Sequence, residues 1–186
     1  MMELTDVYDS EKRRTGRVVP RYQWGPDGFR LTVHICIFDG DRMLIQKRSM
    51  GKRIHPGLWD LSSAGQVDAG EDSHEGASRE VREELGLRYG ITENDLCVTV
   101  RMPHTFDDTY ILEYDGSPIT LQESEVDEIA WASADEIVSM IDDRSFIAYR
   151  PEFIRMLFDA HRNGSRNLPE IGLDECVLPV WKNGYA

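Results

Sequence analysis

Three glutamates crowd one short stretch of this sequence. Glu80, Glu83 and Glu84 fall within little more than one turn of a predicted helix. At about 100° per residue, Glu84 lies about 40° from Glu80, and Glu83 lies about 60° to its other side. Like charges three and four residues apart destabilise a helix by a few tenths of a kcal/mol per pair. The crowding is typical either of a solvated charged face or of carboxylates gathered around a neutralising partner.

The helix that carries these glutamates has clear end signals. Asp72 or Ser73 can cap its start, with Glu75 as the capping-box partner of Asp72, and Gly86 follows where a left-handed residue commonly ends a helix. One side of the helix is apolar, and we expect it to pack on the protein body. That stripe consists of Ala77, Val81 and Leu85. A ladder of Glu75, Arg79 and Glu83 at intervals of four residues would hold Glu83 in place.

The wider spacing is more specific than the glutamates alone. Gly65 is followed after five residues by Glu71, and seven residues later residues 79–87 read REVREELGL. This segment matches the pattern G-x5-E-x7-R-E-U-x-E-E-x-G-U, with U aliphatic, at every position. The pattern is the Nudix box, and the chain therefore resembles the Nudix hydrolases.

The resemblance implies an α/β fold, an α/β/α sandwich with a mixed central sheet. It also implies a loop–helix–loop that binds Mg²⁺ or Mn²⁺, hard ions that prefer carboxylate oxygen. The metal ligands it suggests are Glu80, Glu83, Glu84 and the carbonyl of Gly65, with Arg79 orienting the glutamates. The family reaction is attack of water on a diphosphate that links a nucleoside to a group X. Glu83, Glu84 and Arg79 are then the expected catalytic residues, and the identity of the general base stays open.

Cationic side chains just before the box could hold the phosphates. The segment KRSMGKRIH, residues 47–55, is a local basic patch in an acidic chain, and Arg48 and Lys52 are the predicted substrate contacts. A solubilising loop is the alternative. Trp59 is expected to anchor the core rather than to stack on a base. His34, between apolar neighbours, is expected to be a core histidine.

A further cluster stands downstream of the box. His104, Asp107 and Asp108 either add a metal or base contribution or belong to an ordinary polar turn.

Segments around the box also resemble one branch of the family, the one related to isopentenyl-diphosphate isomerase. That isomerase protonates and deprotonates an alkene, and it needs a cysteine and a histidine shortly after the tryptophan. Ala64 and Gln66 stand at those positions here, and neither can act as the acid or the metal ligand. The chemistry expected is therefore hydrolysis. Isomerisation and nucleotide binding without turnover remain the alternatives.

Composition bounds the remaining possibilities. The chain has 186 residues and a net charge of −13, which argues against general binding to nucleic acid or to anionic membranes. Its three scattered cysteines predict free thiols, and no apolar run is long enough to span a membrane. We expect a cytoplasmic enzyme acting on a small-molecule diphosphate, with a homodimer left open.

The elements around the box suggest three parts: a hairpin extension over residues 1–27, a Nudix domain over 28–162 and a loosely docked tail over 163–186. The predicted strands cover residues 5–10, 16–22, 31–38, 42–48, 96–102 and 109–114. Residues 119–141 are expected to form a strand followed by a helix, and residues 150–164 an amphipathic helix.

Overall fold

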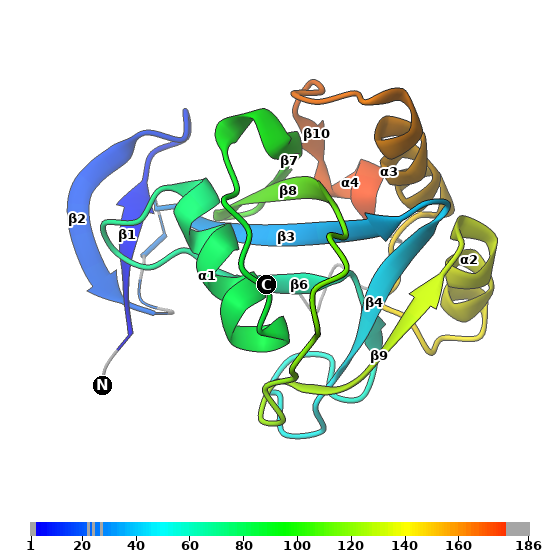
Figure 1. Ribbon diagram of the computed structural model, residues 1–186. Coiled ribbons are helices and arrows are strands. Elements are labelled where there is room, and N and C mark those ends of the chain that lie inside the picture. The colour runs from blue at the N-terminus through cyan, green and yellow to red at the C-terminus, as the bar shows by residue number, and fades with distance from the viewer. Residues whose placement is uncertain (1–2, 22, 24, 27, 178–186) are drawn as a thin grey trace.

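The computed structural model describes residues 3–21, 23, 25–26 and 28–177. An N-terminal antiparallel hairpin, β1 (Leu4–Tyr8) and β2 (Arg14–Pro20), stands apart from a larger sheet (Figure 1). The larger sheet contains β3 (Arg30–Asp39), β4 (Arg42–Arg48), β5 (Trp59–Asp60), β6 (Ser63–Gln66), β7 (Leu96–Met102), β8 (Thr105–Glu113), β9 (Val126–Ala132) and β10 (Ile171–Gly172). The helices are α1 (Ser73–Leu85), η1 (Glu93–Asp95), α2 (Ala134–Asp142), α3 (Pro151–Asn163) and α4 (Leu173–Cys176).

The sheet is mixed and is organised around β3. Its strand order is β10-β7-β8-β3-β4-β5, with β6 paired to β3 and β9 paired to β4. β8 runs parallel to β3, whereas β4 and β6 run antiparallel to it. β6 pairs with residues 32–35 of β3, and β4 pairs only with residues 38–39. Two antiparallel strands, β6 and β4, therefore pair with different parts of the same edge of β3.

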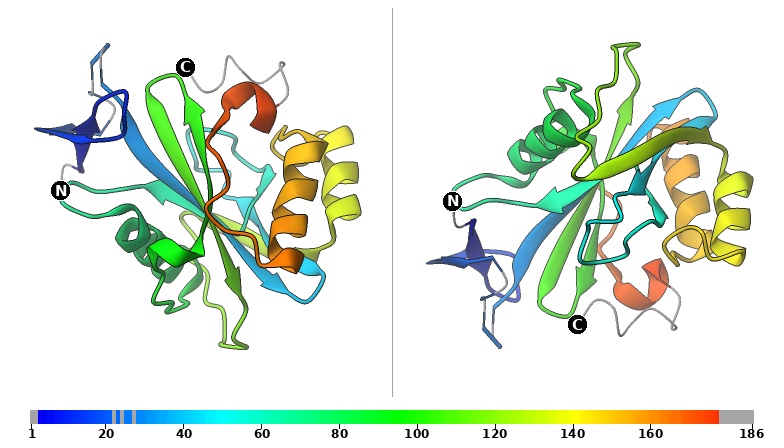
Figure 2. Two further views of the ribbon diagram at one scale, coloured as in Figure 1. Left: turned by 90° about the horizontal axis from the view of Figure 1, so that it is seen from above. Right: turned by 90° about the horizontal axis from the view of Figure 1, so that it is seen from below.

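Helices cover both faces of this sheet. Successive side chains of a strand point to opposite faces. Val33 and Ile35 of β3 accordingly join a core with α1, whereas Cys36 and Phe38 join a core with α2 and α3. Figure 2 shows α1 on one side of the sheet and the α2–α3 pair on the other. The predicted α/β/α sandwich with a mixed central sheet is confirmed.

Helix α1 forms as its end signals predict. The Asp72 amide donates to the Glu75 carboxylate over 2.8 Å, and Gly86 ends the helix in the left-handed region with φ 71°. The predicted packing stripe is fully buried against the sheet. Its members are Ala77, Val81 and Leu85. Since Glu75 is the capping-box partner, the predicted ladder reduces to the Arg79–Glu83 pair.

Two expectations about element limits were wrong. β8 begins at Thr105 rather than at 109, so Asp107 and Asp108 are buried strand residues and not part of a polar turn. The segment after α3 is more firmly docked than expected. β10 pairs in parallel with β7, and Cys176 and Val177 are buried. Residues 178–186 of the predicted tail lie outside the described residues.

The hairpin docks beside the start of α1. Tyr8 bridges to Phe29, and the ammonium of Lys12 lies 2.5 Å from the carboxylate of buried Asp108. That carboxylate also accepts from Thr99 and Ser73, over 2.6 and 2.5 Å. The three cysteines, all within the described residues, are buried free thiols, as predicted. In the described part of the chain, no helix combines the length and the apolar character needed to cross a membrane.

Candidate active site

Arg79 connects the acidic residues of the box. Its guanidinium contacts Glu71 over 2.9 Å, Glu80 over 2.8 Å and Glu83 over 3.3 Å. It also donates to the backbone carbonyl of Gln66 on β6, over 2.9 Å. Burial opposes its charge, but the surrounding carboxylates raise the pKa of Arg79 above its ordinary value. Arg79 therefore ties the helix to β6 and fixes the glutamates beside it.

Glu80 is packed directly against Gly65. A Cβ built on Gly65 would lie 1.9 Å from the carboxyl carbon of Glu80, so a side chain at position 65 would displace the Glu80 carboxylate. Burial raises the pKa of Glu80 to about 7, with Arg79 opposing the shift and Glu84 adding to it. The predicted metal ligands Gly65 and Glu80 thus lie together.

Glu84 is the most buried of the three glutamates, with 3% of its surface exposed. Its Oε2 accepts from the Ser63 hydroxyl over 2.7 Å, and from the Ala64 amide and the Gln46 side chain over 3.2 Å each. Burial raises the pKa of Glu84, and these hydrogen bonds oppose the shift. Glu83, by contrast, has a side chain that is 46% exposed, and its partners are Arg79 and Arg82.

The donor set fits a divalent cation at Glu80 and Glu84. Carboxylate oxygens are the ligands that Mg²⁺ and Mn²⁺ prefer, and a partly buried carboxylate that interacts with a buried one favours a positive neighbour. Within the described residues, no three His, Cys, Asp or Glu side chains are already gathered tightly enough to hold an ion. The reason is that Arg79 occupies one side of Glu80 and that Glu83 points toward solvent. Glu83 is thus the least supported of the predicted ligands.

The two predicted substrate contacts differ in their surroundings. The Lys52 ammonium pairs with Glu125, and its charge acts on the Glu84 carboxylate, where it lowers the pKa. Arg48 lies 3.3 Å from the buried carboxylate of Asp60, and it also donates to the carbonyl of Ile54. Lys52 therefore lies near Glu84, whereas Arg48 forms its ion pair with Asp60.

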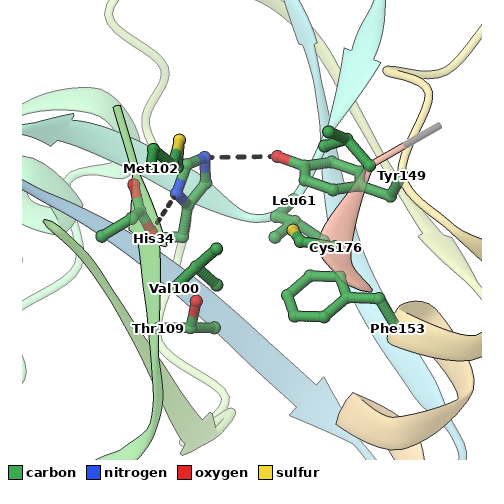
Figure 3. Close-up of a pocket in the computed structure, with 10 residues that line it drawn as sticks. His34, Leu61, Val100, Met102, Thr109, Tyr149, Phe153 and Cys176 are labelled. Atoms are coloured by element: carbon green, nitrogen blue, oxygen red, sulfur yellow. Dashed lines mark hydrogen bonds and ion pairs between the residues drawn. The ribbon is translucent and has the colours of Figure 1, made fainter. Parts of the chain in front are cut away.

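Asp60 is connected to a polar group, formed by His34, Asp107 and Tyr149, that lines a small pocket between the sheet and α3 (Figure 3). His34 Nδ1 lies 2.7 Å from the Asp107 carboxylate, and its Nε2 lies 3.3 Å from the Tyr149 hydroxyl. Tyr149 in turn donates to Asp60 over 3.0 Å. Burial alone would lower the pKa of His34, but Asp107 raises it to about 9. His34 is thus part of a charged network, not the plain core histidine that was expected.

Comparison with known proteins decides the family. Residues 28–154 match the model of the NUDIX domain, and a Nudix hydrolase of Listeria monocytogenes serovar 1/2a is 33% identical over 85% of this chain and 95% of its own length. The chain belongs to the Nudix hydrolases. Solved structures share the fold at low identity, among them DR0079 from Deinococcus radiodurans, with a TM-score of 0.67 at 20% identity over 82% of this chain and 98% of that one.

A second solved structure is that of an enzyme of known activity. It is an ADP-ribose pyrophosphatase from Streptococcus suis, with a TM-score of 0.58 at 17% identity over 78% of this chain and 99% of that one. At this identity it shows a common fold. Membership of the Nudix hydrolases makes this chain a hydrolase, and its substrate is a separate question.

Three polar residues around the Nudix box were not predicted as site residues: Gln46, Asp60 and Tyr149. Gln46 could have been found from strand alternation, because it lies two residues after Leu44 and therefore on the face of β4 that α1 covers. Asp60 and Tyr149 carry no such signal, since their partners come from distant elements. Trp59 is partly buried and packs on the core, as expected.

The two positions of the isomerase comparison lie on β6. Ala64 pairs with His34 in the register of the sheet, and Gln66 pairs with Thr32. The side-chain oxygen of Gln66 accepts from Arg21 over 3.1 Å. In this Nudix hydrolase, position 66 thus anchors the N-terminal hairpin.

Proposed function

We propose that this protein is a metal-dependent hydrolase that cleaves the diphosphate linkage of a nucleoside-diphosphate-type substrate. The observation that carries the proposal is the buried carboxylate of Glu84 with the partly buried carboxylate of Glu80 beside it, the latter packed against Gly65. Burying such carboxylates is costly unless a cation neutralises them in the working enzyme. The activity of the Streptococcus suis protein, an ADP-ribose pyrophosphatase, is consistent with this substrate class.

Hydrolysis of a diphosphate requires charge neutralisation and a water held in line. Water oxygen forms a bond to one phosphorus, the bond from that phosphorus to the bridging oxygen breaks, and a carboxylate takes the water proton. Mg²⁺ or Mn²⁺, when bound, would offset the negative charge of the phosphates and make the attacking water easier to deprotonate. Glu80, Glu84 and the Gly65 carbonyl would hold the ion, with Arg79 keeping Glu80 in place.

The remaining residues act on the substrate. Lys52 supplies a positive charge near the Glu84 carboxylate, where the phosphates would lie, and its contact with Glu125 sets its position. Glu84 and Glu83 are the candidates for the general base. Three donors fix the position of the Glu84 carboxylate, whereas the Glu83 side chain is half exposed.

A substrate panel tests this function. Nucleoside diphosphates, nucleotide sugars, ADP-ribose and dinucleoside polyphosphates would be incubated with the protein and Mg²⁺, and monophosphate products would be quantified. We expect turnover of at least one diphosphate class that disappears with EDTA and returns with added Mg²⁺. Binding of a nucleotide without any product would instead identify a sensor and contradict the proposal.

A further inference from the structure

The N-terminal hairpin lies along the loop that leads from β6 to α1, residues 67–72, here called the β6–α1 loop (Figure 1). The carbonyl of Leu4 accepts from the amide of Ala69 over 3.0 Å. The hydroxyl of Thr5 donates to the carbonyl of Val67 over 3.2 Å. β1 therefore holds the first half of this loop by hydrogen bonds to its backbone.

An ion pair of the hairpin holds the second half of the loop. Asp6 is 8% exposed, and its Oδ2 accepts from the Gly70 amide over 2.9 Å and lies 3.3 Å from Nε of Arg14. The Arg14 guanidinium also lies 2.9 Å from the Asp72 carboxylate and donates to the carbonyl of Glu71. A planar guanidinium can hold two carboxylates and a carbonyl at once, which a lysine ammonium does less rigidly. Arg14 thus fixes the backbone on both sides of the bond between Glu71 and Asp72.

The side chain of Glu71 connects this loop to the glutamates of the box. Its Oε1 accepts from Arg79 Nε over 2.9 Å, and its Oε2 accepts from Arg79 Nη2 over 3.0 Å and from the Asp68 amide over 3.1 Å. The remaining nitrogen of Arg79, Nη1, contacts the Glu80 carboxylate over 2.8 Å. A shift of the Glu71 backbone would therefore move Arg79 and, with it, Glu80.

We propose that Asp6 and Arg14 are positioning residues for the ion site of this hydrolase, so that the N-terminal hairpin is a working part of its active site. The proposal rests on the proposed function, in which Glu80 is a ligand of the divalent cation. Asp6 and Arg14 touch neither the substrate nor the ion. They fix the β6–α1 loop, and Glu71 passes its position through Arg79 to Glu80.

Neighbouring arginines of the hairpin provide a matched pair of variants. Arg14→Met removes the guanidinium that contacts the loop. Arg13→Met makes the same exchange one residue earlier, where the side chain is 72% exposed and pairs with Glu11. Arg14→Lys keeps the charge but not the planar fork. Should Arg14→Met fail to fold, Arg14→Lys makes the same comparison. Asp6→Asn removes the partner charge and keeps the shape of that side chain.

Three quantities separate positioning from a merely structural role. They are the Kd of Mn²⁺ for the substrate-free protein, measured by electron paramagnetic resonance of the free ion, the Mg²⁺ concentration for half-maximal turnover, and the melting temperature in EDTA. We expect the first two to rise about tenfold in Arg14→Met, because residues that orient metal ligands typically contribute this much to affinity. Asp6→Asn should change them in the same direction, and Arg14→Lys should be intermediate. At saturating Mg²⁺ and substrate, kcat should stay within about threefold of wild type, since the site is then filled in every variant.

An unchanged Kd of Mn²⁺ in Arg14→Met, or an equal rise in Arg13→Met, would overturn the assignment. A lower melting temperature in EDTA with an unchanged Kd would do the same, since that is the result expected of a purely structural contact. In each of these the wild-type protein still hydrolyses its substrate, so the proposed function stands.

Absence of turnover by the wild-type protein across the whole panel would instead remove the proposed function. The Kd of Mn²⁺ in Arg14→Met and Arg13→Met would still decide whether the hairpin positions the ion site. Absence of Mn²⁺ binding by the wild-type protein would overturn both.

Discussion

At the scale of single residues, the glutamates of the box are not equivalent. Glu84 is enclosed by β4 and β6, Glu80 lies against Gly65, and Glu83 remains half exposed. The box spacing predicts that the three belong together, and the helical angles predict that Glu80 and Glu84 are closest. The distinction between them comes from partners on other strands, Gln46 and Ser63, which a helix pattern does not contain.

Gly65 tests the position of Glu80. In Gly65→Ala, the added methyl group would overlap the Glu80 carboxyl carbon, so this flexible side chain must move. We expect activity to fall at least about tenfold, since misplacing one charge-assisted ligand removes more than a kcal/mol of transition-state stabilisation. The melting temperature should change by only a few degrees, because a side-chain end rather than backbone gives way. Gly90→Ala, with open space around its Cβ, is the control. Unchanged activity in Gly65→Ala would disconnect Gly65 from the site.

Lys52 and Arg48 should respond differently to truncation. Lys52→Met should raise KM about tenfold with little change in kcat, because a charge that contacts the phosphates stabilises ground and transition states alike. Arg48→Met should instead lower the free energy of unfolding by about 3 kcal/mol, because it leaves the buried Asp60 carboxylate without its cation. Steady-state kinetics and urea unfolding measure the two effects. Identical kinetic losses in both variants would restore the original prediction of a joint phosphate site.

At the scale of elements, parallel pairing of β8 with β3 builds the His34–Asp107 pair. Thr32 is the register partner of Asp107 and donates to its carboxylate over 2.5 Å, while His34 approaches from two residues further along β3. The polar residues around Asp107 suggested a turn. Sequence alone does not show that His34 on the neighbouring strand neutralises this buried carboxylate. The strands with plain apolar patterns, such as residues 31–38 and 42–48, were predicted closely.

The His34–Asp107 pair predicts a loss of stability in alkaline solution. The pKa of His34 is raised from about 6.5 in the unfolded chain to about 9 in the folded one. Its contribution is therefore complete below about pH 6.5 and is lost as the pH rises through 9, at most about 3 kcal/mol. Urea unfolding from pH 6 to 10 should show a steeper decline for the wild type than for His34→Gln. Parallel curves for the two proteins would show that His34 is not charged by Asp107.

At the scale of the whole molecule, the family and the sandwich followed from one motif, and the substrate did not. The Nudix box indicates a diphosphate in the substrate. The residues that would bind the group X come from several elements and form no single motif. The hairpin and the C-terminal segment show the same limit. The hairpin strands were predicted and β10 was not, and the contacts that dock the two segments, Lys12 with Asp108 and β10 with β7, join residues far apart in the chain.

The wild-type protein should not convert isopentenyl diphosphate to dimethylallyl diphosphate. Ala64 provides no acid, and the Gln66 amide is engaged with Arg21, so neither position supports the proton transfers of an isomerase. Incubation with Mg²⁺ followed by chromatographic separation of the two isomers measures this directly. Isomer formation above a protein-free blank would contradict this prediction and support the isomerase alternative.

The most direct measurement for the whole account is the turnover of Glu84→Gln on the best diphosphate at limiting Mg²⁺, with melting temperatures recorded with and without the ion. This change keeps the shape of the side chain and removes one charge. If Glu84 serves a bound cation, turnover should fall by orders of magnitude, and the gain in melting temperature on adding Mg²⁺ should shrink. If the glutamates were only a solvated charged face, full activity would remain and relief of like-charge repulsion would stabilise the fold by a few tenths of a kcal/mol. Full activity in Glu84→Gln at saturating substrate would contradict the metal-dependent mechanism.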